Sequence, residues 1–348
     1  MLKRWIKFFL ISIVCFVGSS NLFGRTEDIK SFQTDDLFSH TEPLDLIVYA
    51  DFEALKSNRD KTVPYQKVSL SYVNNDTDTI KVLSQIRVRG NYRLRETTCS
   101  FPPLKFKFRS RDVDSTIFEG CNRLKLVTHC QDDEVEMHNS AMRELLAYQI
   151  YNEICDFSLQ VRLVNVVYVD INTEDRVTQR GFFIEDVECL SRRNNMEEFN
   201  SVNLTMEQLS QNNMIRMSMF QLMIGNNDWS VPKLHNVVLM REGTHTPPIA
   251  VPYDFDMSAF VNAPYRKSIL GEEEVRCVYK GHRVEVEELE ETIDLFVERR
   301  GAIVDLILDF PYLDVKNKQL CLQKIDEFYN LFDHKSSIRR TFVSKPKS

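Results

Sequence analysis

The sequence lacks cysteine pairs at the close CxxC spacing that zinc sites and thiol redox motifs use, because its eight cysteines are scattered along the chain. It also lacks a basic excess, and a formal net charge of −7 argues against a general nucleic-acid binder. No low-complexity tract or repeat follows the first residues. With 43% hydrophobic residues in 348, the chain is instead predicted to be a folded, soluble globule of two lobes.

The amino terminus is predicted to be a secretory signal covering residues 1–20. An apolar run from Phe8 to Val17 follows three basic residues and precedes Gly18-Ser19-Ser20. This order is typical of an exported protein that is cleaved near Ser20. The run is shorter than the roughly 20 residues that cross a bilayer, so no stable membrane span is expected after cleavage. We expect residues 21–41 to be a polar lead-in and the protein to reach the periplasm or cell surface.

The cysteines permit disulfides if the protein is exported. Loss of Cys15 with the signal leaves an odd number, so one thiol stays unpaired. Buried thiols are the preferred interpretation, and the local candidates for a pair are Cys121 with Cys130 or Cys99 with Cys121.

Residues 42–190 are predicted to form a β-rich lobe. The expected strands, rich in β-branched and aromatic residues, are Leu46–Tyr49, Val68–Val73, Gln85–Arg89, Leu104–Arg109, Arg123–Thr128, Val161–Ile171 and Gly181–Ile184. One helix is expected between Asn139 and Cys155, where apolar residues fall at helical spacing and Ser140 marks the start.

Residues 191–348 are predicted to form a mainly helical lobe. Thr205 and Gln208 have the pattern of a capping box ahead of an apolar stretch that ends at Gly225. Later helices are expected over Val286–Arg299, Ala302–Phe310 and Val315–Phe332, with Leu320, Ile325, Phe328 and Phe332 facing the core. The fold class is therefore α+β, with a hinge near residues 185–195 and a nucleotide between the lobes.

Two aspartate-bearing motifs flank a predicted hairpin in this second lobe. The strands His235–Met240 and Pro248–Tyr253 would bring Asp228 and Asp254 to one end. Phosphoryl transfer needs a group that positions the attacking hydroxyl and others that hold divalent ions. We therefore predict that Asp228 is the catalytic base or orienting residue.

The remaining polar residues of these motifs are oxygen donors suited to a hard cation such as Mg²⁺. Asn236 and Asp254 are the predicted metal ligands, with Asp256 as a further ligand. His235 is expected to orient the loop that carries Asp228 by a hydrogen bond. The alternative is that Asn226, Asn227 and Asp228 cap a helix and form a turn.

Basic residues recur at every second position of the predicted strands. They are Arg87 and Arg89, then Lys105, Lys107 and Arg109, then Arg123 and Lys125. Residues two apart share one face of a strand, so adjoining strands would make a cationic surface for phosphate. Arg87, Arg89, Lys105, Lys107 and Lys125 are the predicted cofactor-binding residues. The alternative is an ordinary half-buried sheet with its polar side toward water.

Glu144 lies on the helix that interrupts the strands. Kinase-like sites use a helix glutamate to hold a strand lysine against the nucleotide phosphates. We expect Lys107 or Lys125 to be its partner. Otherwise, Arg143 and Glu144 are solvated helix residues.

In these motifs the chain resembles the spore coat protein H (CotH) family of atypical protein kinases. The stretches that carry the resemblance are Ile86–Asn91, Pro103–Phe108, Met142–Tyr148, Gly181–Glu185, Asn227-Asp228 with Asn236, and Tyr253–Asp256. The resemblance implies a kinase-like fold, ATP with Mg²⁺ or Mn²⁺, Asp228 as catalytic residue, Asp254 as metal ligand, and serine or threonine of proteins as acceptor. The chain departs from the family in having Trp229 where a basic residue is common.

Two other functions are compatible with the sequence. One is a cell-envelope binding or structural protein that keeps the kinase fold without catalysis. The other is a sugar-nucleotide transferase that uses Asp254-Phe255-Asp256 as a DxD motif. The second is less favoured, because such enzymes need alternating strands and helices ahead of the motif.

Overall fold

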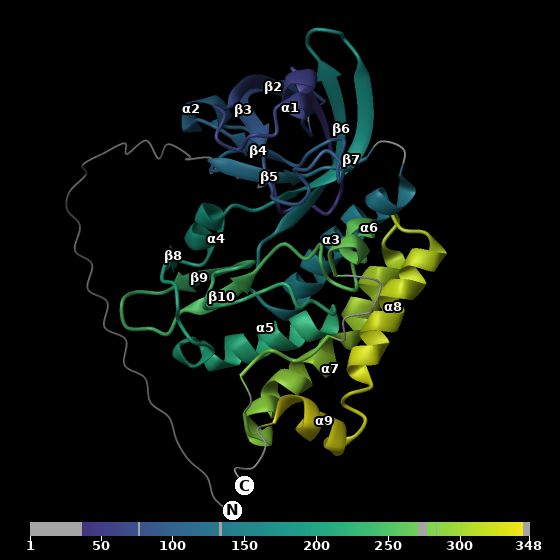
Figure 1. Ribbon diagram of the computed structural model, residues 1–348. Coiled ribbons are helices and arrows are strands. Elements are labelled where there is room, and N and C mark those ends of the chain that lie inside the picture. The colour runs from purple at the N-terminus through teal and green to yellow at the C-terminus, as the bar shows by residue number, and fades with distance from the viewer. Residues whose placement is uncertain (1–36, 76, 132–133, 271–276, 283, 344–348) are drawn as a thin grey trace, which may run out of the picture. The chain divides into compact units, whose positions relative to one another are not determined.

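Strands dominate the first half of the chain and helices the second, as the sequence pattern predicts (Figure 1). The computed structural model describes residues 37–75, 77–131, 134–270, 277–282 and 284–343. The predicted signal, Cys15 and most of the polar lead-in lie outside the described residues. The predicted lobe boundary near residues 185–195 stays a prediction. Within the described part, no helix combines the length and apolarity needed to cross a membrane.

The strands of the first half close into a barrel in the order β1-β2-β3-β4-β5-β7-β6. Their bounds are β1 Leu44–Ala50, β2 Gln66–Val73, β3 Thr79–Val88, β4 Leu104–Lys107, β5 Arg123–Val127, β6 Val161–Asp170 and β7 Arg176–Ile184. β1 and β6 pair in parallel, whereas the other neighbours are antiparallel. Leu104 and Phe106 are buried in the barrel core, so Lys105 and Lys107 face outward.

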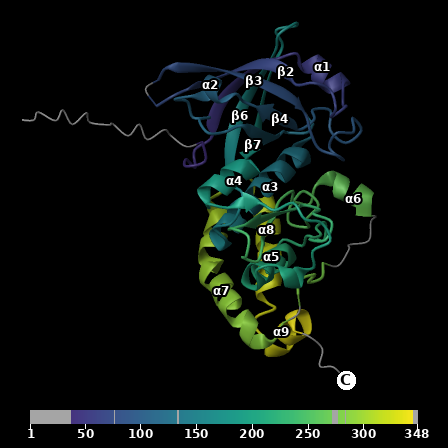
Figure 2. The ribbon, with the colours of Figure 1, turned by 90° about the vertical axis from the view of Figure 1, so that its left-hand side faces the viewer.

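Helix α3, Val135–Ile154, packs against barrel strands β6 and β7 and against α7, Val286–Asp309 (Figure 1 and Figure 2). The other helices are α1 Phe52–Ser57, α2 Ser110–Val113, α4 Val187–Arg193, α5 Gln211–Met223, α6 Pro264–Leu270, α8 Val315–Tyr329 and α9 Lys335–Phe342. A small sheet has the order β10-β9-β8, with bounds β8 Glu197–Glu198, β9 Val237–Arg241 and β10 Ile249–Pro252. The predicted hairpin is therefore the β9–β10 pair.

Several helix boundaries differ from the sequence prediction. α3 begins at Val135, so Ser140 is a buried residue inside the helix rather than its start. α7 runs unbroken through Gly301, because buried Phe296, Ile303 and Ile307 hold it on both sides of an exposed glycine that costs about 1 kcal/mol.

Two further expectations are corrected in the second half of the chain. Leu320 is 40% exposed, so it does not belong to the core-facing side of α8. The capping box of Thr205 and Gln208 exists, but it caps a 3₁₀ turn, Met206–Gln208, and α5 begins separately at Gln211.

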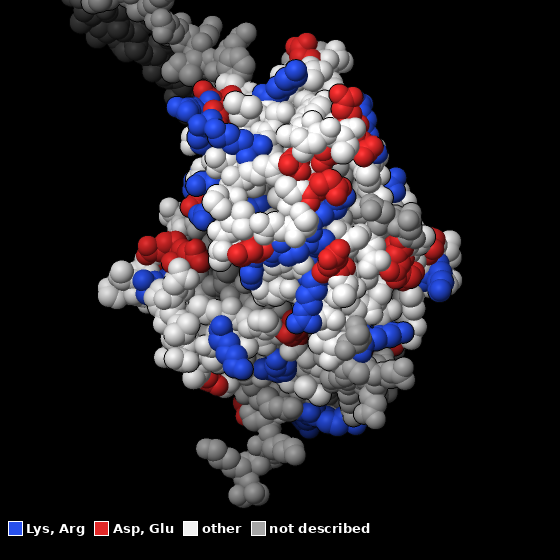
Figure 3. Space-filling view, turned by 45° about the horizontal axis from the view of Figure 1, so that its top comes forward, with Lys and Arg blue, Asp and Glu red and all other residues white. Residues whose placement is uncertain are grey.

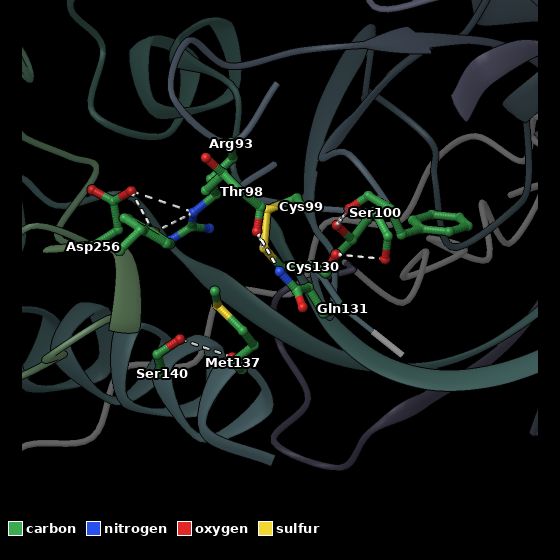
Figure 4. Close-up of a disulfide and its surroundings, with 12 residues drawn as sticks. Arg93, Thr98, Cys99, Ser100, Cys130, Gln131, Met137, Ser140 and Asp256 are labelled. Atoms are coloured by element: carbon green, nitrogen blue, oxygen red, sulfur yellow. Dashed lines mark hydrogen bonds and ion pairs between the residues drawn. A yellow bond between two sulfur atoms is a disulfide. The ribbon is translucent and has the colours of Figure 1, made fainter. Parts of the chain in front are cut away.

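A disulfide joins Cys99 and Cys130, which is a pair that the local spacing did not suggest (Figure 4). Cys99 lies in the loop between β3 and β4, and Cys130 follows β5. Because β4 lies between β3 and β5 in the barrel, the loop before β4 meets the segment that follows β5. The amide of Phe101 in that loop donates to the carbonyl of Cys130 at 3.0 Å. Cys99 and Cys130 pair with each other, and Cys121 is buried in the barrel core, so both expected pairs, each of which includes Cys121, are wrong.

Candidate functional site

A cleft of about 610 Å³ is lined by residues of the barrel and of the β9–β10 region. The barrel contributes Arg89, Arg93 and Lys125, and the β9–β10 region contributes Asp228, Asn236 and Asp254. A larger groove of about 830 Å³ follows the outer side of β1, β2, β6 and β7 beside α3. Neither aspartate motif reaches that groove, so the smaller cleft is the candidate site.

The loop that carries Asp228 leaves α5 at a tight turn. Gly225 has a φ of +66°, and a Cβ atom there would lie 2.8 Å from the Cβ of Ala259. Only glycine fits this left-handed conformation and close approach without strain. The Oδ1 atom of Asn226 then accepts a hydrogen bond from the amide of Asp228 at 2.9 Å. The alternative prediction, that Asn226, Asn227 and Asp228 form a turn, therefore holds. This turn places Asp228 in the lining of the cleft.

Both carboxylate oxygens of Asp228 have partners. Nε2 of His235 lies 2.7 Å from Oδ1, and Nδ2 of Asn236 donates to Oδ2 at 3.1 Å and to the Asp228 carbonyl at 2.8 Å. His235 therefore forms a hydrogen bond to the loop, as predicted, and its partner there is the Asp228 carboxylate. The Asp228 side chain stays 41% exposed, so an acceptor group can approach it.

Asn236 and Asp254 are brought together by the hairpin. The amide of Tyr253 donates to the carbonyl of Asn236 at 3.0 Å, so Asp254 follows directly at the end of the β9–β10 pair. Asn236 and Asp254 both have left-handed backbones, with φ of +53° and +62°. Such conformations store strain and cluster at functional sites. The amide of Asp254 donates to the hydroxyl of buried Tyr148 at 2.8 Å, which fixes the turn.

Three of the basic strand residues form one row across the barrel surface. Arg87 lies opposite Lys105 in the β3–β4 pair, and Lys105 lies opposite Lys125 in the β4–β5 pair. Burial lowers the pKa of Lys105, and nearby arginines lower it further. Basic and acidic side chains are interspersed on the face shown in Figure 3, so that face is not uniformly basic.

Lys125 is the lysine of this row that lines the cleft. Its Nζ lies 4.7 Å from the ring centroid of Tyr253, and burial lowers its pKa to about 8, with a further contribution from Arg89. Arg89 also lines the cleft. A cation held in a partly dry site binds phosphate oxygens more strongly than one in bulk water.

The other predicted basic residues lie outside the cleft lining. Arg87 donates to the carbonyl of Lys61 at 3.1 Å and stacks on Tyr65. Lys107 is exposed, and Lys105 is half-buried behind Lys125 in the row. These residues contribute positive charge near the site rather than contacts within it.

Glu144 pairs with Arg93 instead of the expected Lys107 or Lys125. An Nη2 atom of Arg93 donates to Oε2 of Glu144 at 2.6 Å, and both side chains are buried. Glu144 points to the loop after β3, whereas Lys125 on β5 turns toward Tyr253. The alternative, that Arg143 and Glu144 are solvated, is also wrong, because both are buried.

The pair belongs to a larger buried cluster, of which Figure 4 shows Arg93 beside Asp256. Nε of Arg93 donates to the hydroxyl of Tyr265 at 2.6 Å and lies 3.3 Å from Oδ2 of Asp256. The Tyr265 hydroxyl in turn donates to the same Asp256 oxygen at 2.7 Å. Burial, together with the neighbouring charge of Asp254, raises the pKa of Asp256 to about 6. Burial likewise raises the pKa of Glu144 to about 7, although Arg93 opposes this.

The donor atoms at this end of the cleft fit a magnesium or manganese ion that phosphate helps to hold. The Nδ2 atom of Asn236 donates to Asp228, so the Oδ1 atom of Asn236 is the ligand atom for a cation, beside the carboxylate of Asp254. Among described residues, none donates a hydrogen bond to that carboxylate. No three described His, Cys, Asp or Glu residues form a ready-made metal cluster. Mg²⁺ does not need one, because it usually binds one or two carboxylates together with phosphates and water.

Arg93, Tyr265 and Lys280 are residues of the region that the sequence did not single out. Arg93 and Tyr265 complete the buried cluster, and Lys280 contacts the Asp228 loop. Arg93 lies in an irregular loop, three residues after Gly90, and carries no periodic signal. Its position beside the Ile86–Asn91 stretch was the available clue.

Comparison with protein-family models found no match, and no curated protein matched the chain. The solved structures that resemble it include a crystal structure of the Golgi casein kinase with Mn/ADP bound, at 9% sequence identity and a TM-score of 0.35, covering 76% of this chain and 77% of that one. A second crystal structure of the Golgi casein kinase has 9% identity and a TM-score of 0.34, covering 90% of this chain and 77% of that one. The chain thus resembles a kinase distantly in structure.

Proposed function

We propose that the protein is an exported, metal-dependent protein kinase of the CotH type, with a two-lobed kinase-like fold. It would transfer phosphate from ATP to serine or threonine of proteins. The observation that carries the proposal is the meeting of Asp228, Asn236 and Asp254 with Lys125 in one cleft. Phosphoryl transfer is catalysed mainly by positioning and by charge stabilisation, and these residues supply both.

Asp228 acts on the acceptor in this proposal. Its carboxylate, oriented by His235 and Asn236, accepts a hydrogen bond from the acceptor hydroxyl and takes its proton as the hydroxyl oxygen bonds to the γ-phosphorus. The bond between the γ-phosphorus and the bridging oxygen breaks, and ADP leaves. The partial exposure of Asp228 gives the acceptor access.

Lys125 and Arg89 bind the phosphates from the barrel side. Asn236 and Asp254 would hold Mg²⁺ or Mn²⁺ from the opposite side. When bound, the ion neutralises charge on the phosphate oxygens. Asp256 already accepts a hydrogen bond from Tyr265 and faces Arg93, so it supports Asp254 through the buried cluster.

Export is proposed from the amino-terminal signal. The Cys99–Cys130 disulfide supports it, because such bonds form and persist mainly in oxidising compartments. The sugar-nucleotide alternative needs both aspartates of the DxD motif at a metal, and the engagement of Asp256 with Tyr265 and Arg93 argues against it.

The test measures phosphate transfer from labelled ATP to the protein itself and to a serine-rich acceptor, with Mg²⁺ or Mn²⁺ and with a chelator. We expect metal-dependent labelling that Asp228→Asn and Asp254→Asn abolish. Asp305→Asn, on the exposed side of α7, is the matched control and should label normally. Nucleotide binding without labelling would favour a binding protein that keeps the fold. Labelling that survives Asp254→Asn would contradict the assigned site.

A further inference from the structure

Lys280 holds the backbone on both sides of Asp228. Its Nζ donates to the carbonyl of Asn227 at 2.9 Å and to the carbonyl of Trp229 at 2.7 Å. The same ammonium group lies 5.1 Å from the ring centroid of Trp229. Lys280 lies 53 residues from Asn227 in the sequence, so this contact exists only in the folded chain. One side chain therefore holds a backbone carbonyl on each side of Asp228.

The segment 277–282 that carries Lys280 is itself anchored. Buried Tyr279 packs edge-on against Phe342 with ring centroids 5.0 Å apart, and its hydroxyl donates to the carbonyl of His282 at 3.1 Å. Nδ1 of His282 lies 3.0 Å from a carboxylate oxygen of Glu207. A Cβ atom at Gly281 would lie 2.5 Å from the Cβ of Ser218, so the chain approaches α5 as closely as glycine permits.

The charge of Lys280 is held beside the loop. Its side chain is half-buried, and burial lowers its pKa, whereas Asp228 raises it. Two carbonyl acceptors and an aromatic face compensate for the lost hydration. A neutral side chain of similar length would fill the space but would leave both carbonyls without their donor.

We propose that Lys280 is a positioning residue that fixes the Asp228 loop for the transfer step. The expected effect of Lys280 on the transfer rate rests on the proposed function, whereas the contacts of Lys280 with the loop do not. Misplacing a reacting group by about 1 Å can cost about 10²-fold in rate. Loss of Lys280 therefore lowers kcat, while nucleotide affinity is kept because Lys125 and Arg89 bind from the barrel.

Trp229 provides a readout that is independent of catalysis. The sequence has two tryptophans, Trp5 and Trp229, so full-length protein with Trp5→Phe reports on the loop alone. Lys280→Met and Lys280→Arg are made in this background, with Lys233→Met as a matched control, because Lys233 is an exposed lysine of the same region. Emission and acrylamide quenching of buried Trp229 are measured together with kcat and with KM for ATP.

We expect Lys280→Met to shift Trp229 emission to longer wavelength, to increase its quenching, and to lower kcat about 10²-fold with KM for ATP changed less than about two-fold. Lys280→Arg should recover most of both signals, and Lys233→Met should match the parent. Unchanged fluorescence, or unchanged kcat in an active parent, overturns the inference. If the parent transfers no phosphate, the proposed function fails, and the fluorescence alone decides whether Lys280 fixes the loop.

Discussion

Glu144 and Arg93 form a buried ion pair at 2.6 Å, and Arg93 also lies 3.3 Å from Asp256. The guanidinium group of Arg93 therefore contacts two carboxylates, that of Glu144 on α3 and that of Asp256 in the segment after β10. The cluster connects the loop between β3 and β4 to α3 and to the segment that contains Asp254. It explains why two carboxylates whose pKa values are raised by burial can lie next to the proposed metal ligand.

Arg93→Met should destabilise the protein strongly. Removing one partner of a buried pair leaves an uncompensated charge, at a cost of about 3 to 5 kcal/mol in free energy of unfolding. The measurement is urea unfolding at neutral pH. Lys56→Met, which removes an exposed pair with Glu53 at 2.6 Å, is the control and should change stability by less than about 1 kcal/mol. An equally small change for Arg93→Met would contradict the role of the cluster.

The stability of the protein should fall as pH rises from about 4 to about 7. The pKa of Asp256 is raised to about 6 and that of Glu144 to about 7, so the folded state binds protons more tightly than the unfolded state. Their contribution is complete below the unfolded pKa values and is lost as pH rises through the folded ones.

Urea unfolding between pH 4 and 8 tests this dependence. Glu144→Gln should reduce the slope of unfolding free energy against pH, whatever its effect on the absolute value. Exposed Glu298→Gln on α7 should leave the slope unchanged. A slope that persists in Glu144→Gln would assign the dependence to other groups.

The sequence predicted the features that local patterns determine. Alternation located the barrel strands, and the turn residues between Met240 and Pro248 located the hairpin that brings Asn236 to Asp254. The periodic basic residues also predicted the row that ends at Lys125, because a strand with one buried face has a fixed register.

Contacts made by irregular segments escaped prediction. Arg93 lies in the loop between β3 and β4, and Lys280 lies in a segment without regular structure, so neither has a periodic signal. The partner of Cys99 depends on which strands adjoin in the barrel, which spacing alone does not reveal. Lys107 and Lys125 looked equivalent in sequence, and only the position of β5 beside the cleft separates them.

Lys125→Met should weaken ATP binding by about 10- to 100-fold, because a charge-assisted hydrogen bond in a partly buried site is worth about 1.5 to 3 kcal/mol. Lys107→Met should change affinity by less than about two-fold, since Lys107 is exposed and outside the cleft lining. Isothermal titration calorimetry with Mg²⁺ and a non-hydrolysable ATP analogue measures both. If Lys107→Met weakened ATP binding more than Lys125→Met, the phosphate site would lie elsewhere on the barrel surface.

The same lysine should set an alkaline limit for binding. Burial lowers the pKa of Lys125 to about 8, so in the free protein its positive charge is lost as pH rises through that value. ATP affinity should therefore decline above about pH 8. Lys125→Arg should shift the decline to higher pH, because a guanidinium group stays charged. An unchanged limit in this variant would assign it to another group.

The Cys99–Cys130 disulfide should keep the cleft loop in place. It closes a 31-residue separation and ties the loop that carries Arg93 to the segment leading into α3, where Glu144 lies. Cys99→Ser with Cys130→Ser should cost about 2 to 4 kcal/mol in free energy of unfolding. Reductant should lower the Tm of the parent toward that of the double variant and should leave the double variant unchanged. Because Arg93 connects the loop to Asp256, ATP affinity should fall along with Tm when the disulfide is reduced. Full ATP affinity in the reduced protein would show that the disulfide does not support the site.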